Sequence, residues 1–428
     1  MKELYELGEA PPLGVVPPRM YAATLREPRF GVPRDAFQIE VLEVPKVGRT
    51  QVLVWVMAAG MNYNGVWAAL GHPVNVIAAR RRSGQTEDFH IAGSDAAGIV
   101  WNTGDGVSNV QVGDEVVLSC GTWDENAADI QAGADPITSS SARIWGYETN
   151  WGSFAQFALV EAYQCFPKPQ QLSWAASACY MLTGATAWRM LHGYPPNTVG
   201  EDHPVLVWGG AGGLGAMAIQ IVREAGGHAI AVVSDDAKRP FCMQLGARAV
   251  LNRGDSDHWG PLPNPDGPEF ETWLAGAQAF GHRFWEAFGE KRNPKIVFEH
   301  PGLDTLPTSI FVCDNAGMVV ICAGTSGFNA DVDLRYLWMR SKRLQGSHFS
   351  STRQILEFNG MVVDGRIEPP LTQVSDLHDV GEAHQLMYEN RHPPGKTAIL
   401  VNASDERCTI ARSDPSCSDF PDGSIVMA

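Results

Sequence analysis

Glycines at fixed spacing form the clearest chemical signal in this 428-residue sequence. Residues 205–215 read VLVWGGAGGLG, and the pattern G-x-G-x-x-G lies between a predicted strand and a predicted helix. In that setting the first glycine permits a tight turn, the second admits a pyrophosphate close to the backbone, and the third lets helix pack on strand. The helix N-terminus adds free N–H groups and partial positive charge. The loop predicts a dinucleotide site formed by Gly210, Gly212, Gly213, Leu214 and Gly215.

The next predicted strand indicates which dinucleotide binds. It ends at Ser234, and Asp235, Asp236, Lys238 and Arg239 follow. An NAD site usually has an acid at the strand tip to hold the ribose 2′-hydroxyl, whereas a hydroxyl with two cations suits a 2′-phosphate. The two aspartates are the counter-evidence, and capping of the next helix is their alternative role. The sequence favours NADPH, held by Ser234, Lys238 and Arg239.

The elements that must position these residues change character along the chain. The first ~175 residues read as short β-branched or alternating runs broken by Gly and Pro. From residue 205, strands alternate with helices, which predicts a parallel, doubly wound sheet and an α/β fold. A long insertion over 255–294 is rich in Pro and Trp and then helical, and the Ser/Asp-rich residues 403–428 suggest a loose tail. The predicted strands of the sheet are 205–208, 229–234, 249–251, 296–299, 318–323 and 344–349.

The composition is that of an ordinary globular protein, with 44% apolar and 19% charged residues. A chain of this length suits two or three domains. The net charge of −16 opposes non-specific binding to nucleic acid or to an anionic membrane. No run reaches the ~18 apolar residues of a membrane span, and the first residues lack the basic-then-apolar order of a secretory signal. We therefore expect a cytoplasmic enzyme with no membrane or nucleic-acid partner.

A β-rich domain followed by a late nucleotide fold resembles the medium-chain dehydrogenase/reductase superfamily. Zinc-dependent members carry Gly-His-Glu near the site and a cysteine after the third or fourth strand, where this chain has Gly93-Ser94-Asp95 and Met61-Asn62. Zinc needs at least three nitrogen, sulfur or carboxylate ligands, and the eight cysteines form no CxxC pair. The chain thus resembles the zinc-free branch, and we expect no metal.

This resemblance implies two domains. A GroES-like β-rich catalytic domain is expected over residues 1–177, completed by 350–428. A Rossmann domain that binds NADPH is expected over residues 178–349.

Several segments narrow the resemblance to the crotonyl-CoA carboxylase/reductases. WGYETN and LQGSHF are the most specific, and AAGMNYNGVW, HIAGSDAAGIVW, GATAWRML, VFEHPG and PPLGVVP agree with them across roughly residues 8–402. The resemblance implies NADPH-dependent reductive carboxylation of a 2-enoyl-CoA, crotonyl-CoA or a longer homologue. Hydride addition to Cβ creates an enolate that attacks CO2, giving an alkylmalonyl-CoA such as ethylmalonyl-CoA. It also implies a homotetramer.

The family's CO2 pocket implies four catalytic residues here. They are Asn64 in NYN, Tyr147 and Glu148 in WGYETN, and His348 in GSHF. The amide would donate to one CO2 oxygen, while the backbone at Tyr147 and a water between Glu148 and His348 would reach the other. Each residue also has a structural interpretation: a turn residue, a packing ring, a helix cap or a buried histidine. Asn62 is a weaker candidate, and His300 is interpreted as structural.

Coenzyme A carries phosphates, so an acidic protein must gather cations locally to bind it. The segment RYLWMRSKR and the residues after it supply such cations. The alternative is a solvated face that balances nearby acids. The predicted CoA-binding residues are Arg335, Lys342, Arg343 and Arg353.

Two other functions compete with carboxylation. An enoyl-CoA or quinone reductase would protonate the enolate and fix no CO2, and it would not need the set of Asn64, Glu148 and His348. A non-catalytic NADPH-binding protein would keep the glycine loop and lose the substrate motifs, whereas both are present.

Overall fold

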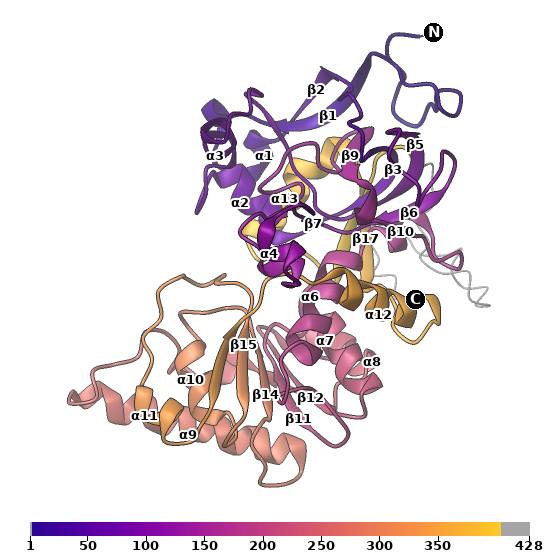
Figure 1. Ribbon diagram of the computed structural model, residues 1–428. Coiled ribbons are helices and arrows are strands. Elements are labelled where there is room, and N and C mark those ends of the chain that lie inside the picture. The colour runs from indigo at the N-terminus through magenta and orange to yellow at the C-terminus, as the bar shows by residue number, and fades with distance from the viewer. Residues whose placement is uncertain (1, 404–428) are drawn as a thin grey trace. The chain divides into compact units, whose positions relative to one another are not determined.

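The computed structural model describes residues 2–403. It divides into two compact units, with boundaries after Leu182 and after Ile367. In Figure 1 the first unit combines the indigo-to-magenta part of the chain with its yellow end. The sequence predicted boundaries after 177 and 349; all but the first residue of the expected tail lies outside the described residues.

A seven-stranded sheet forms the centre of the first unit, in the order β10-β6-β5-β3-β18-β17, with β9 also paired to β3. Its neighbours are antiparallel except for β17 and β18. The chain therefore returns from the second unit to complete this sheet. The strands are β3 (Gln51–Gly60), β5 (Ala96–Thr103), β6 (Glu115–Leu118), β9 (Phe157–Glu161), β10 (Cys165–Pro167), β17 (Leu371–Asp376) and β18 (Lys396–Leu400).

Two smaller sheets and short helices surround this centre. Trp55, Trp101 and Phe157 pack with Met20 and Leu53 in its core. The further strands are β1 (Arg19–Leu25), β2 (Gln38–Glu43), β4 (His90–Ile91), β7 (Gly121–Thr122) and β8 (Arg143–Ile144). The helices are α1 (Pro33–Ala36), α2 (Tyr63–Leu70), α3 (Val76–Arg82), α4 (Ala128–Gln131), α5 (Trp174–Ser177) and α13 (Val380–Tyr388).

The second unit contains a six-stranded sheet in the order β13-β12-β11-β14-β15-β16, with every neighbouring pair parallel. This order is that of a doubly wound dinucleotide fold, as the alternation of strands and helices predicted. The order in which successive strands are added to the sheet reverses between β11 and β14, where such folds bind their ligand. The strands are β11 (Pro204–Val207), β12 (His228–Val233), β13 (Ala249–Asn252), β14 (Ile296–Glu299), β15 (Met318–Ile321) and β16 (Arg343–Gly346).

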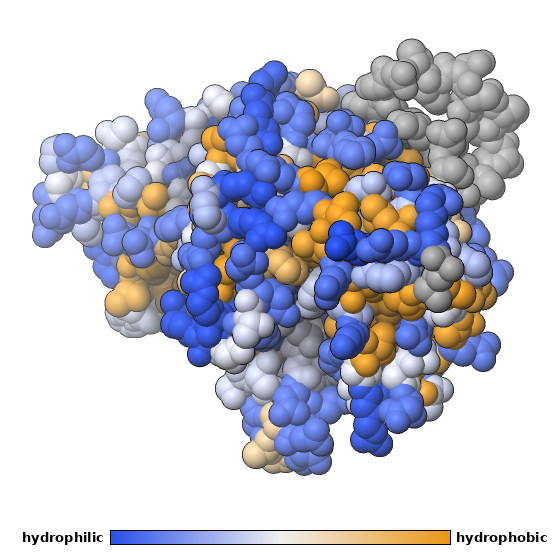
Figure 2. Space-filling view, turned by 90° about the horizontal axis from the view of Figure 1, so that it is seen from above, coloured by the Kyte–Doolittle hydropathy of each residue, from blue (hydrophilic) through white to orange (hydrophobic). Residues whose placement is uncertain are grey.

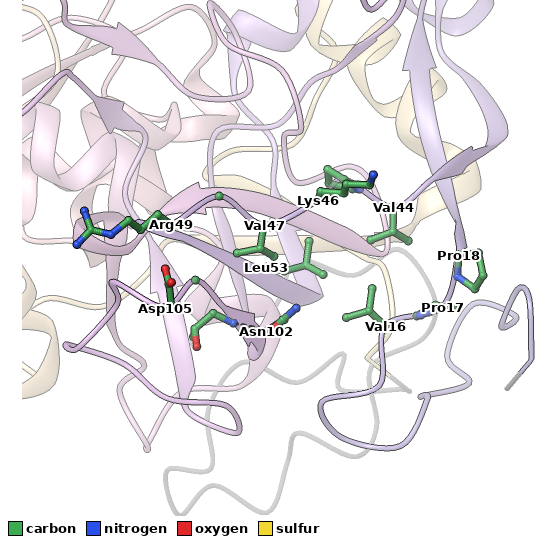
Figure 3. Close-up of a pocket in the computed structure, with 14 residues that line it drawn as sticks. Val16, Pro17, Pro18, Val44, Lys46, Val47, Arg49, Leu53, Asn102 and Asp105 are labelled. Atoms are coloured by element: carbon green, nitrogen blue, oxygen red, sulfur yellow. Dashed lines mark hydrogen bonds between the residues drawn. The ribbon is translucent and has the colours of Figure 1, made fainter.

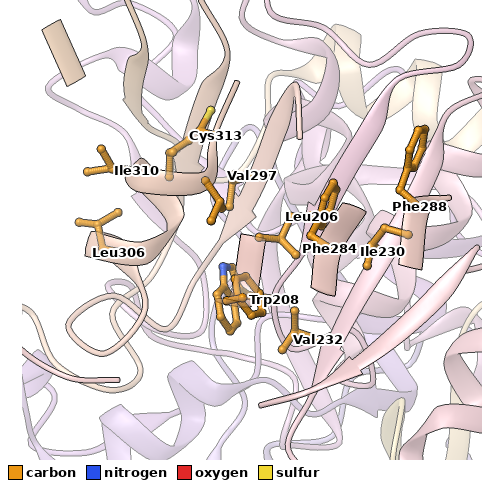
Figure 4. Close-up of a cluster of buried hydrophobic side chains, with 13 residues drawn as sticks. Leu206, Trp208, Ile230, Val232, Phe284, Phe288, Val297, Leu306, Ile310 and Cys313 are labelled. Atoms are coloured by element: carbon orange, nitrogen blue, oxygen red, sulfur yellow. The ribbon is translucent and has the colours of Figure 1, made fainter. Parts of the chain in front are cut away.

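The predicted helix of the insertion is α9 (Pro268–Phe288), and its aromatic face covers the sheet. Phe280, Phe284 and Phe288 are buried there with Trp208 and Val297 (Figure 4). The other helices are α6 (Met181–His192), α7 (Gly213–Glu224), α8 (Arg239–Gln244), α10 (Leu306–Val312), α11 (Leu334–Trp338) and α12 (Thr352–Val363).

Packing explains why the second unit extends past residue 349. Phe358 of α12 lies so close to Gly184 of α6 that a Cβ at that glycine would clash with its ring. Arg189 of α6 also donates to Gln354 Oε1 at 2.9 Å. These contacts assign α12 to the second unit. The face shown in Figure 2 is mostly polar with apolar patches. Among residues 2–403, no helix is both long and apolar enough to cross a membrane.

Candidate functional site

The glycine loop between β11 and α7 has little room for side chains. Gly209 adopts the left-handed φ of 57°. A Cβ at Gly210 would lie 2.6 Å from Cβ of Ala231, and one at Gly215 would lie 2.7 Å from Cα of Gly210. Gly212 is the N-cap of α7, and its nearest neighbouring atom would be 3.4 Å from an added Cβ. The outer side of the loop is therefore open where a pyrophosphate would approach, while its inner side is closely packed.

The tip of β12 presents a hydroxyl and a cation together. Lys238 Nζ donates to Ser234 Oγ at 3.2 Å, and Ser234 is exposed. Asp235 accepts a backbone N–H two residues on at 2.9 Å, and Asp236 accepts from Arg239 at 2.8 Å. Arg239 also donates to a backbone carbonyl of β13. The two aspartates thus accept hydrogen bonds from nearby residues of the chain. Ser234 and Lys238 are therefore better placed than Arg239 to bind an anion.

His300 lies at the reversal point of the sheet, although the sequence interpretation treated it as structural. It follows β14, and its ring lies so close to Gly209 that no Cβ would fit there. A hydrogen bond to the backbone of Trp208 fixes the ring, and desolvation lowers its pKa to about 4. A neutral imidazole therefore lines the glycine loop. The signal that could have identified it is its place directly after the strand neighbouring β11.

A buried carboxylate anchors the loop that carries His300. Glu299 is fully buried, and its Oε1 accepts from Thr305 Oγ1 at 2.7 Å and from the N–H of Gly302 at 3.1 Å. Ser309 Oγ donates to Oε2 at 2.5 Å and accepts from Trp208 Nε1 at 2.8 Å. Burial outweighs these donors and raises the pKa of Glu299 to about 7.

In the first unit, Asn64 lies in the first turn of α2 and is half-buried. Its Nδ2 donates to Ser94 Oγ at 2.8 Å. Ser94 is fully buried. An amide nitrogen has two protons, so one stays available after this bond.

An ion pair contacts Asn62, two residues before Asn64. Lys396 Nζ is 3.2 Å from Asp95 Oδ2 and donates to Asn62 Oδ1 at 2.7 Å. The predicted Asn62 thus contacts charged residues that sequence reasoning did not select. Among the described residues, no group of three or more His, Cys, Asp or Glu side chains is placed to hold a metal ion.

The Tyr147–Glu148 pair lies in the turn after β8. Glu148 Oε2 accepts the N–H of Ile144 at 2.8 Å. The Tyr147 ring is 6.4 Å from that of Trp67 on α2, which brings this turn beside the helix that carries Asn64. Burial, followed by the charge of Glu148, raises the pKa of Tyr147 to about 12, so its phenol stays neutral.

His348 belongs to the second unit, where it is exposed just after β16. The predicted water between it and Glu148 stays a prediction.

Each predicted CoA-binding cation has a partner within the chain. Arg335 and Arg353 form ion pairs with carboxylates nearby in sequence at 2.7 and 2.9 Å. Lys342 Nζ donates to two backbone carbonyls near the end of α10 at 2.7 and 3.0 Å, and burial lowers its pKa. Arg343 donates to a backbone carbonyl at 3.2 Å. Arg353 is the most exposed of the four, at 79%.

A pocket of about 540 Å³ opens elsewhere in the first unit (Figure 3). Its lining includes Val16, Lys46, Arg49, Leu53 and Asp105. None of the predicted site residues lines it.

Comparison with known proteins gives a consistent result. Residues 48–170 match the alcohol dehydrogenase GroES-like domain, and residues 213–363 match the zinc-binding dehydrogenase family. A crotonyl-CoA carboxylase/reductase of Cereibacter sphaeroides is 49% identical over 94% of this chain and 92% of its own. A crotonyl-CoA reductase of Streptomyces avermitilis is 37% identical over 87% of this chain and 84% of its own.

Solved structures agree with this similarity. The crotonyl-CoA carboxylase/reductase AntE in complex with NADP is 58% identical, with a TM-score of 0.91, and the match covers 95% of this chain and all of that one. The 2-octenoyl-CoA carboxylase reductase CinF, in complex with NADP and 2-octenoyl-CoA, is 31% identical with a TM-score of 0.84, over 92% and 90% of the two chains.

Proposed function

The chain belongs to the crotonyl-CoA carboxylase/reductase family, and we propose that it reduces and carboxylates a 2-enoyl-CoA thioester. NADPH supplies the hydride that adds to Cβ of the thioester. The electron pair of the C=C bond moves to Cα as an enolate, which forms a C–C bond to CO2 and yields an alkylmalonyl-CoA. The observation that carries this proposal is 49% identity to a carboxylating relative over nearly the whole chain.

The residues present fit NADPH. The inner side of the glycine loop is closed at Gly210 and Gly215, and its outer side is open at Gly212. Ser234 and Lys238 form a pair of donors that we propose binds the ribose 2′-phosphate. Arg239 already forms an ion pair with Asp236, so it would contact the same phosphate while keeping that pair.

Asn64, Tyr147, Glu148 and His348 are the proposed CO2 and catalytic residues. Ser94 holds one Asn64 amide proton, and the other donates to a CO2 oxygen. Oε2 of Glu148 accepts a backbone N–H of its own turn. In the proposed site, Oε1 of Glu148 and His348 orient a water toward the second oxygen of CO2. The raised pKa of Tyr147 makes its phenol a poor acid, which slows protonation of the enolate.

Reduction without carboxylation is the second candidate. Two relatives, 37% and 36% identical, carry the name crotonyl-CoA reductase. In that case a proton would reach Cα and the product would be the saturated acyl-CoA.

One experiment separates the two candidates. Purified protein is incubated with NADPH, ¹³C-labelled bicarbonate and 2-enoyl-CoAs of several chain lengths, and the thioesters are identified by mass spectrometry. We expect a labelled carboxyl group in the product, and a larger saturated fraction for Glu148→Ala and His348→Asn. Glu125→Ala, an exposed acid of the same unit, is the matched control. Unlabelled product from every substrate would establish the simple reductase, and an unchanged product ratio in both variants would remove those residues from the site.

The CoA phosphates are proposed to bind at Arg335, Lys342, Arg343 and Arg353. Arg353 is the better placed, because its partner Glu357 belongs to an exposed pair that contributes little by itself. Arg335 would have to leave Asp333, whose side chain is only 6% exposed. To bind a CoA phosphate, Lys342 would have to break its hydrogen bonds to backbone carbonyls of α10.

A homotetramer is proposed as the assembly. Apolar side chains on and beside α11 and β16 are exposed: Leu334 at 62%, Trp338 at 69% and Met339 at 60%. β16 is an edge strand of its sheet. Several large exposed apolar side chains beside an open strand edge are typical of an interface. Light scattering would then report the mass of four chains. We keep the cytoplasm as the proposed location, since the six cysteines among the described residues are free thiols.

A further inference from the structure

A buried lysine of the last strand holds the turn that presents Asn64. We propose that Lys396 is a positioning residue for carboxylation: it fixes the start of α2, and thereby the Asn64 amide that faces CO2. This inference rests on the proposed function. It concerns a residue 332 positions away from Asn64 along the chain.

The ammonium group of Lys396 is fully used. Its Nζ donates to the carbonyl of Met61 at 2.6 Å, to Asn62 Oδ1 at 2.7 Å and to Asp95 Oδ2 at 3.2 Å. An ammonium has three protons, and three acceptors are present. The side chains of the ion pair are 4% and 1% exposed. Each bond is therefore made in a water-poor place where its geometry is well defined.

Asn62 shows that the turn has been adapted to this lysine. It is the N-cap of α2, with φ −141° and ψ 155°, yet its side chain caps no backbone N–H. An asparagine at an N-cap ordinarily accepts from the first turn of its helix. Here Oδ1 accepts from Lys396 instead, and Nδ2 donates to Asp95 at 3.2 Å. The direction in which α2 starts is thus coupled to the ion pair.

The acid of the pair reaches the other side of Asn64. Asp95 follows Ser94, whose hydroxyl accepts from the Asn64 amide at 2.8 Å. The second oxygen of Asp95 accepts the N–H of Leu182 at 2.9 Å. Lys396 and Asp95 therefore connect both supports of the amide, the turn before it and the serine that holds its proton.

The strands give this arrangement a fixed base. In β18 the residue pairs run Ala398 with Gly60 and Ile399 with Ala59 of β3, directly before the turn. A Cβ at Gly60 would clash with the carbonyl of Ala178, so the last residue of β3 packs closely against its neighbours. A buried ion pair is often no more stabilising than apolar side chains of the same volume. Its presence is better explained by the position it imposes than by stability.

The test compares variants in the labelled-bicarbonate assay. Asp95→Asn/Lys396→Met removes both charges and buries no unpaired ion, and Asn62→Ala removes the two bonds that the Asn62 side chain makes with the ion pair. The matched control is Thr397→Val, the next residue of the same strand, whose hydroxyl makes a weak contact with Gln373 at 3.4 Å. We expect the apparent KM for CO2 to rise about fivefold or more, the saturated by-product to increase, and NADPH oxidation to stay within about threefold of wild type.

The outcomes are distinct. Variants that fold, as judged by circular dichroism, and keep the wild-type KM for CO2 and product ratio would overturn the proposal. A parallel fall of reduction and carboxylation would also overturn it, because that is the effect of a merely structural residue. If the double variant does not fold, Asn62→Ala decides by the same two readouts. If wild-type protein forms no labelled product, the proposed function fails, whatever the variants do.

Discussion

Replacement of Glu299 by glutamine should remove a pH dependence of stability. Burial raises the pKa of this carboxyl group from 4.5 to about 7 in the folded protein. Between these values the folded state holds a proton that the unfolded state has released. The free energy of unfolding therefore falls as pH rises from about 4.5 to about 7, and it stays level above that range.

The size of the effect follows from the same two values. Each pH unit between them is worth about 1.36 kcal/mol, so Glu299 costs the folded protein about 3 kcal/mol at neutral pH relative to acid pH. The carboxyl group is fully buried, so solvent screening does not reduce this figure much. In Glu299→Gln the group cannot ionise, and its share of the pH dependence disappears.

Urea unfolding followed by tryptophan fluorescence, at steps between about pH 5 and pH 8, measures this difference. Wild type should lose about 3 kcal/mol of stability relative to Glu299→Gln across the range. Glu290→Gln, an exposed acid of the same unit, is the control and should run parallel to wild type. If the curves of wild type and Glu299→Gln also run parallel, burial does not outweigh the hydrogen-bond donors and the pKa of Glu299 is not raised.

The remaining predictions concern the cofactor. Ser234→Asp places a carboxylate beside Lys238, so kcat/KM with NADPH should fall about tenfold or more while NADH is used relatively better, measured by steady-state kinetics with both cofactors. An unaltered preference would place the 2′-phosphate elsewhere. Gly215→Ala forces a Cβ to 2.7 Å from Gly210 Cα, so the KM for NADPH should rise and stability should fall by about 1–3 kcal/mol in thermal unfolding. Gly360→Ala, where α12 leaves open space, should instead stabilise by about 0.5–1 kcal/mol, and equal effects of the two substitutions would contradict the packing argument.

Local pattern was sufficient for the cofactor loop. Gly215 is required by backbone atoms of Gly209 and Gly210, and the contact of Ser234 with Lys238 spans one helical turn. The alternation of strands and helices likewise predicted the parallel sheet. These features depend on residues that are close in sequence, so sequence patterns are able to predict them.

The contacts that sequence reasoning did not predict depend on strand order. His300 reaches Gly209 only because β14 lies beside β11. Lys396 meets Asp95 only because β18 pairs with β3. The boundary after Ile367 depends on α12 packing against Gly184. No spacing rule in the sequence encodes these long-range contacts.

The return of the chain into the first sheet also orders its synthesis. The second unit is continuous in sequence from Thr183 to Ile367, so its sheet can close as soon as that stretch has left the ribosome. The first sheet cannot be completed until later, because β18 is its last strand to be synthesised. Until then Asp95 has no counter-ion, and the end of β3 at Ala58–Gly60 lacks its partner strand. A chain cut short before residue 396 would therefore combine a finished nucleotide fold with an incomplete first sheet, whose unpaired strand end favours aggregation.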